Sequence, residues 1–69
     1  MDITERRRAL ITQLAAARME KGMTQAQLAR VIGTQRSNIC RLESGSQNLT
    51  LDMFFKIADA LGKEPFFNW

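Results

Sequence analysis

The 69-residue sequence contains no histidine and no tyrosine, and it has one cysteine and one proline. Without histidine, neither a Cys/His metal site nor a Ser-His catalytic arrangement can form. No other metal-ligand spacing and no phosphate-cradling glycine loop is present. The single Cys40 leaves no disulfide within the chain and fits a reducing cytosol. These absences argue against an enzyme, a bound metal and a cofactor.

Long apolar runs are also missing. No segment approaches the ~20 apolar residues that a membrane-spanning helix needs. The arginine run at 6–8 is followed by an apolar stretch that Gln13 and Arg18 interrupt, so a secretory signal is not expected. We therefore expect a cytoplasmic protein without a membrane partner.

Size and charge narrow the class further. The length predicts one domain over residues 1–69, and the 45% hydrophobic content argues against disorder. A domain this small buries only about 60% of its unfolded surface, so a partner subunit would add useful stability. The net charge is +3, and seven of the ten basic residues are arginines. Planar guanidinium groups suit contacts to phosphates and to base edges.

Apolar periodicity and helix-end signals predict an all-α fold, a compact bundle of four or five short helices. A first helix is expected over 2–21, beginning with Asp2 and Glu5 as a capping box and ending at Gly22. Its predicted apolar stripe is Ile3, Leu10, Leu14 and Ala17. A last helix is expected over 51–61 behind Thr50, with a predicted core stripe of Leu51, Phe54, Ile57, Ala58 and Leu61.

The stretch from Thr24 to Gly45 predicts two short helices joined by a tight turn at Gly33. Thr24 and Gln27 have the spacing of a capping box at the start of the first of these helices. The apolar residues of this helix are Leu28, Ala29, Val31 and Ile32. The second helix carries Ile39 and Leu42 on one side and hydrogen-bonding side chains on the others. That arrangement is typical of a helix that reads base edges in a major groove.

At these residues the chain resembles the Cro/phage-repressor type of helix-turn-helix regulators, over roughly 18–62. The matching residues are Gln25, Leu28, Ala29, Gly33, Ser37, Ile39, Arg41, Leu42, Glu43, Gly45, Leu51, Ile57, Ala58, Leu61 and Gly62. The resemblance implies a lambda-repressor-like bundle, a helix-turn-helix over 24–44, and double-stranded DNA as the partner. It also implies an ion pair between Arg18 and Glu43 that ties the first helix to the reading helix.

The residues expected to contact DNA fall into two groups. Base contacts are predicted for Gln35, Arg36, Ser37, Asn38 and Arg41, because arginine pairs with guanine and short polar groups reach base edges. Backbone contacts are predicted for Gln25, Thr34, Ser46, Gln47 and Asn48.

Two local departures from the family pattern affect this region. The family more often has Ser or Thr where Gln35 stands, so Thr34 is favoured as the cap of the reading helix. The loop after that helix is uncharged, and Leu49 stands where the family usually has proline.

Three of the five aromatic residues lie in the last four positions of the sequence, at Phe66, Phe67 and Trp69. Such a tail, 63–69, either folds back on the first and last helices or contacts a second copy of the chain. The second interpretation is favoured, with Phe55 at the same contact, since helix-turn-helix regulators commonly bind two half-sites as dimers.

The function expected from these features is sequence-specific DNA binding by a regulator. The favoured form is a repressor that binds an inverted repeat as a homodimer. The same domain would also suit an antitoxin with a toxin partner, or a controller of a restriction–modification system. A protein-interaction adaptor is a further alternative, against which Arg36 and Arg41 argue.

Overall fold

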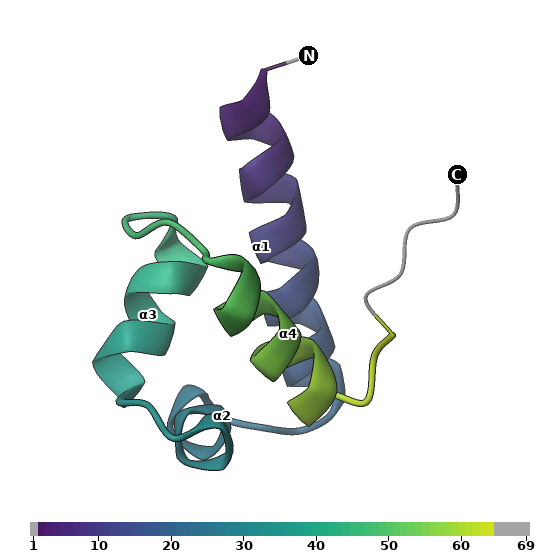
Figure 1. Cartoon of the computed structure of the whole chain (residues 1–69). Coiled ribbons are helices and arrows are strands. Elements are labelled where there is room, and N and C mark those ends of the chain that lie inside the picture. The colour runs from purple at the N-terminus through teal and green to yellow at the C-terminus, as the bar shows by residue number, and fades with distance from the viewer. Residues whose placement is uncertain (1, 65–69) are drawn as a thin grey trace.

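The computed structural model describes residues 2–64, and over that range it contains four helices and no strand. They are α1 (Ile3–Glu20), α2 (Gln25–Ile32), α3 (Arg36–Ser44) and α4 (Leu51–Ala60) (Figure 1). The predicted all-α class is confirmed, with four helices in the described part. None of these helices combines the length and the apolar character that crossing a bilayer requires.

Helix α3 is held from two sides. It contacts both α2 and α1, and α2 also contacts α4. Figure 1 shows α1 as the longest helix, with its first turns extending beyond the ends of the others. The helix-turn-helix therefore rests on α1 and α4.

Side-chain caps set the beginnings of three helices. At α2, Thr24 Oγ1 accepts from Gln27 N at 3.0 Å, and Thr24 N donates to Gln27 Oε1 at 2.8 Å, so the predicted capping box is confirmed. Thr50 Oγ1 accepts from Met53 N at 3.1 Å at the start of α4. Replacing such a threonine with alanine typically costs about 1 kcal/mol.

The start of α1 differs from the prediction. Asp2 Oδ1 accepts from Thr4 N at 3.0 Å, two residues on, and Glu5 completes no capping box within residues 2–64. Because the aspartate bonds to the second helical N–H, the reciprocal geometry of the box is not formed.

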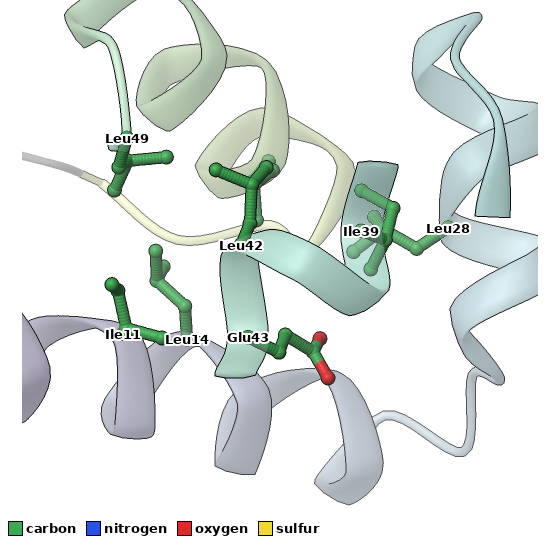
Figure 2. Close-up of a pocket in the computed structure, with 8 residues that line it drawn as sticks. Ile11, Leu14, Leu28, Ile39, Leu42, Glu43 and Leu49 are labelled. Atoms are coloured by element: carbon green, nitrogen blue, oxygen red, sulfur yellow. The ribbon is translucent and has the colours of Figure 1, made fainter. Parts of the chain in front are cut away.

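The core lies where α2, α3 and α4 meet. Its buried members are Leu28, Ala29, Ile39, Leu42, Ile57 and Leu61. Leu28 and Ile39 are each 1% exposed, so the contact between α2 and α3 is the most completely buried part. Figure 2 shows these two side chains meeting around a small space that all four helices and Leu49 line.

The buried stripe of α1 is shifted from the predicted one. Ile11 and Arg18 are its buried residues, while Leu10, Leu14 and Ala17 are half-buried. Ile11, Leu14 and Arg18 recur at i, i+3 and i+7 on the face that meets α3. Figure 2 shows Ile11 and Leu14 on this face. Ile3 is 75% exposed because the first turn of α1 extends beyond its neighbours.

The predicted core residue Leu51 is exposed, and so is Val31, one of the apolar residues of α2. Val31 is 62% exposed and Leu51 is 65% exposed. On α2, at ~100° per residue, Val31 points about 110° away from the centre of the face that Leu28, Ala29 and Ile32 define. Leu51 is the first residue of α4, at the edge of its stripe, and Met53 packs against the core in its place.

Candidate nucleic-acid interface

The turn between α2 and α3 is closed by backbone hydrogen bonds at a left-handed glycine. Gly33 has φ of 75°, and Thr34 N donates to Ala29 O at 2.8 Å. Glycine adopts this conformation without the cost that a Cβ brings. The turn therefore sets the orientation of α3 relative to α2.

The two sides of α3 differ sharply in burial. Ile39 and Leu42 are 1% and 3% exposed and hold the helix against the core. The other sides of α3 carry the exposed side chains of Arg36, Ser37, Cys40 and Arg41, and the exposed Gln35 precedes the helix as its cap residue. Arg36, Ser37 and Arg41, three of the predicted base contacts, are therefore exposed on α3, and a fourth, Gln35, is exposed at its beginning.

The beginning of α3 differs from the prediction at its cap. Gln35 occupies the cap position, with φ of −95° and ψ of 150°, and makes no side-chain cap bond. Thr34 lies one residue too early to reach the first N–H groups, and its Oγ1 instead accepts from Asn38 Nδ2 at 2.9 Å. Arg36 N and Ser37 N consequently have no acceptor within residues 2–64. Free N–H groups at a helix N-terminus attract phosphate.

Behind this surface, Arg18 joins three segments. Its Nε donates to Glu43 Oε2 at 2.8 Å and its Nη2 to Glu43 Oε1 at 3.0 Å. Its Nη1 donates to Met23 O at 2.7 Å, in the connection before α2. The two side chains are only 10% and 15% exposed. This bidentate ion pair therefore links α1, the start of α2 and α3.

Gln25 belongs to the same cluster. Its Nε2 donates to Glu43 Oε1 at 3.0 Å. A carboxylate only accepts hydrogen bonds, so the amide nitrogen must face Glu43. One amide N–H and the amide oxygen of Gln25 remain for another partner, which is compatible with its predicted phosphate contact.

A second polar cluster lies on the outer side of α3, and sequence reasoning missed it. Asn38 Nδ2 donates to Thr34 Oγ1 at 2.9 Å, and Gln47 Nε2 donates to Asn38 Oδ1 at 2.7 Å. Arg41 Nε then donates to Gln47 Oε1 at 3.0 Å. We call Thr34, Asn38, Gln47 and Arg41 the outer chain. Gln47 joins α3 across nine residues of sequence, a separation for which local spacing carries no signal.

In the rest of the loop after α3, the side chain of Ser46 forms hydrogen bonds and that of Asn48 does not within the described residues. Ser46 Oγ donates to Arg41 O at 3.3 Å and lies 3.0 Å from Ser44 Oγ, so it covers the C-terminal end of α3. Asn48 is exposed, and its side chain makes no hydrogen bond within the described residues.

The arginines of this surface carry no carboxylate partner. Over residues 2–64, the ion pair found is Arg18–Glu43. Arg30, Arg36 and Arg41 are exposed, so their charges are available to an anion. Arg36 and Arg41 lie on α3 itself, and Arg30 lies in the last turn of α2.

The predicted dimer residues are mostly beyond what the structure describes. Phe66, Phe67 and Trp69 lie outside the described residues. Phe55 is 45% exposed, and its ring centroid is 5.8 Å from that of Phe54. Phe54 borders an open groove with Leu10, Leu14 and Ala17 of α1.

A profile of the helix-turn-helix family matches residues 14–67, which includes α2, the turn and α3. The chain belongs to the Cro/phage-repressor type of helix-turn-helix DNA-binding regulators. The outward polar side chains of α3 thus lie on the second helix of the motif that gives this family its name.

Individual relatives agree with this family. The chain is 43% identical over 54 residues to the antitoxin HipB of Escherichia coli K12, across 72% of this chain and 61% of HipB. It is 37% identical over 55 residues to an uncharacterized HTH-type transcriptional regulator of Haemophilus influenzae, across 80% of this chain and 56% of the relative. It is 40% identical over 53 residues to another such regulator, from Methanothermobacter thermautotrophicus, across 77% of each chain. The chain therefore spans less than two thirds of the first two relatives.

Proposed function

We propose that this protein binds a specific double-stranded DNA site and represses transcription from it. The observation that carries the proposal is the outer surface of α3, where Arg36, Ser37 and Arg41 are exposed while Ile39 and Leu42 are buried, with Gln35 exposed at the beginning of the helix. A helix presented in this way enters a major groove with its polar side chains towards the base edges. We propose the cytoplasm as the location of this activity.

Charge supports the same partner. Arg30, Arg36 and Arg41 have no carboxylate partner in the described part of the chain, and two N–H groups at the start of α3 are free. Each phosphate that the protein neutralises should lower log K by about 0.9 per unit of log salt. Affinity for DNA is therefore expected to fall steeply between low and physiological salt.

We propose that the active form is a homodimer on an inverted repeat. Two copies related by a two-fold axis would place their α3 helices in successive major grooves, about one helical turn apart. The exposed ring of Phe55 and the presence of Phe66, Phe67 and Trp69 in the sequence of the tail support an aromatic interface.

The experiment that tests the proposal is selection of bound sequences from a random duplex pool, followed by titration of the selected site at several salt concentrations. The expected result is an enriched inverted repeat and an affinity that depends strongly on salt. Absence of any enriched sequence, together with a flat salt response, would refute sequence-specific binding.

A second candidate is an antitoxin that binds both DNA and a toxin. It is favoured by the identity to two proteins named antitoxin HipB, at 43% and 41%. The test is to express the chain together with the product of each gene adjacent to its own and to purify it through a tag. A stable complex that also relieves toxicity of the neighbour supports the antitoxin role, whereas neighbours that neither bind nor inhibit growth count against it.

A further inference from the structure

Gln47 lies in a surface loop, yet its side chain bonds to two side chains of α3. Its amide oxygen accepts from Arg41 Nε at 3.0 Å, and its amide nitrogen donates to Asn38 Oδ1 at 2.7 Å. The amide oxygen and one amide N–H are therefore used, and the residue is partly buried although Ser46 and Asn48 beside it are exposed. Only the second amide N–H of Gln47 remains for a phosphate contact, because the first points to Asn38.

We propose that Gln47 is a positioning residue for Arg41, in place of the phosphate contact that its sequence position predicts. The proposal deepens the proposed function and rests on it, since it assigns how α3 is prepared to read DNA. Gln47 acts through Arg41 and does not itself read a base.

The bond to Gln47 determines which N–H donors of Arg41 remain free to contact DNA. With Nε bonded to Gln47, the two terminal nitrogens of the guanidinium remain for DNA. Guanine presents two acceptors, O6 and N7, in the major groove, and paired donors of one arginine match them. Holding Nε fixes the plane of the guanidinium before DNA arrives. The ordering of a long, flexible side chain is then partly complete in the free protein, which favours binding.

Asn38 gains a different role from the one its sequence position predicts. Its oxygen accepts from Gln47 and its nitrogen donates to Thr34 at 2.9 Å. A bidentate contact to adenine needs one donor and one acceptor on the same edge of the amide. The oxygen and one N–H of Asn38 already have partners, so a bidentate contact to adenine would compete with these bonds. Asn38 is therefore assigned to the support of Gln47, and the base-reading set narrows to Gln35, Arg36, Ser37 and Arg41.

The first experiment uses the free protein, so it does not depend on DNA binding. The Arg41 Nε–Hε signal is recorded by ¹H–¹⁵N NMR in the wild-type chain, in Gln47→Met and in Asn48→Ala. Methionine has a similar length and no amide, and Asn48 is the adjacent loop amide without a partner in residues 2–64. Loss of one hydrogen bond should speed exchange of this proton about five-fold in Gln47→Met. Asn48→Ala should leave it unchanged.

The second experiment measures sequence discrimination on the selected site. Gln47→Met should weaken binding to that site about five-fold, and should have less than a two-fold effect on a site altered at the base pair that Arg41 reads. In an Arg41→Ala background, Gln47→Met should have no further effect, because the group that it positions is gone. Asn48→Ala should instead weaken both sites equally, as the loss of a phosphate contact does. Thermal unfolding of each variant reports whether the fold is intact.

The outcomes separate the two proposals. An Arg41 Nε–Hε signal that is the same in wild type and Gln47→Met overturns the positioning role, whatever the DNA result. Equal weakening of both sites by Gln47→Met also overturns it and returns Gln47 to the phosphate contacts. An altered NMR signal in a protein that selects no DNA sequence refutes the proposed function instead.

Discussion

Helix α3 carries one polar cluster on each side, and the two differ in charge, burial and reach. The inner cluster pairs Arg18 with Glu43 at 2.8 Å, with side chains 10% and 15% exposed, and spans 25 residues of sequence. The outer chain joins Asn38 and Gln47 at 2.7 Å and ends on the exposed Arg41. The inner cluster connects three segments of the fold, whereas the outer chain connects one helix to the loop that follows it.

This difference indicates which free energy each cluster affects. A buried charge whose partner is removed stays buried and uncompensated, so the inner cluster should control the free energy of unfolding. Arg41, at the end of the outer chain, is exposed, so water replaces a partner that its side chain loses. The outer chain should therefore control DNA binding. The following predictions test this separation, from the largest effect to the smallest.

Arg18→Met should produce the largest loss of stability, about 3–5 kcal/mol of unfolding free energy, because it leaves Glu43 without its cation. Arg8→Met, on the exposed side of α1, should change stability by less than about 0.5 kcal/mol. Urea denaturation followed by circular dichroism measures both. The double variant Arg18→Met with Glu43→Met should be more stable than Arg18→Met alone. Equal midpoints for Arg18→Met and Arg8→Met would count against a structural ion pair.

Arg36→Ala and Arg41→Ala should weaken DNA binding and leave the stability of the fold nearly unchanged. Each should lose about 1–3 kcal/mol of binding free energy for the selected site, through the loss of a bidentate base contact. Because both side chains are exposed, unfolding free energy should change by less than about 0.5 kcal/mol. Fluorescence anisotropy with labelled duplexes measures binding, and denaturation measures stability. The separation of the two clusters fails if these variants unfold as readily as Arg18→Met.

Gln25 is the residue at which the two effects should combine, since it bonds to Glu43 and lies at the start of α2. Gln25→Ala should cost about 1 kcal/mol of stability, by removing one hydrogen bond to a charged group. It should also weaken binding to selected and altered sites equally, as a phosphate contact would. Gln13→Ala, an exposed amide on α1, is the control. Normal DNA affinity in Gln25→Ala would limit this residue to the inner cluster.

Ser46→Ala should have the smallest effect, a loss of about 0.5 kcal/mol in binding that is equal for all DNA sequences. Its hydroxyl bonds to Arg41 O at 3.3 Å, but Ser44 Oγ and Ser46 N donate to the same oxygen at 3.0 Å and 3.1 Å. Stability should therefore hardly change. A base-specific loss in this variant, seen in parallel titrations of two sites, would contradict a phosphate contact.

Local rules predicted much of the fold. The caps at Thr24 and Thr50, the turn at Gly33 and the buried pair Ile39 and Leu42 each depend on neighbours within a few residues. Burial of Ile11 rather than Leu10 was not predictable in the same way. It depends on the angle at which α1 meets α3, which no periodicity within α1 specifies.

In the candidate site, too, local sequence patterns predict helical geometry but not contacts between separate segments. The side chains that face outwards from α3 follow from helical geometry, once Ile39 and Leu42 are taken as the buried side. The contact of Gln47 with Asn38 and Arg41 follows from the path of the loop after α3, and the residue type alone equally suited a phosphate contact. The cap of α3 was predicted one residue too early, because Gln35 occupies the cap position and the Thr34 hydroxyl bonds to Asn38 instead of to a backbone N–H.

The central claim is that the outer surface of α3 reads DNA sequence, and parallel selections from one random duplex pool test it most directly. Wild-type protein should enrich an inverted repeat with half-sites about one helical turn apart. Arg41→Ala, which leaves the core untouched, should enrich the same repeat with the preference lost at one base pair of each half-site. Identical enriched sequences for wild type and for both Arg36→Ala and Arg41→Ala would contradict reading by α3.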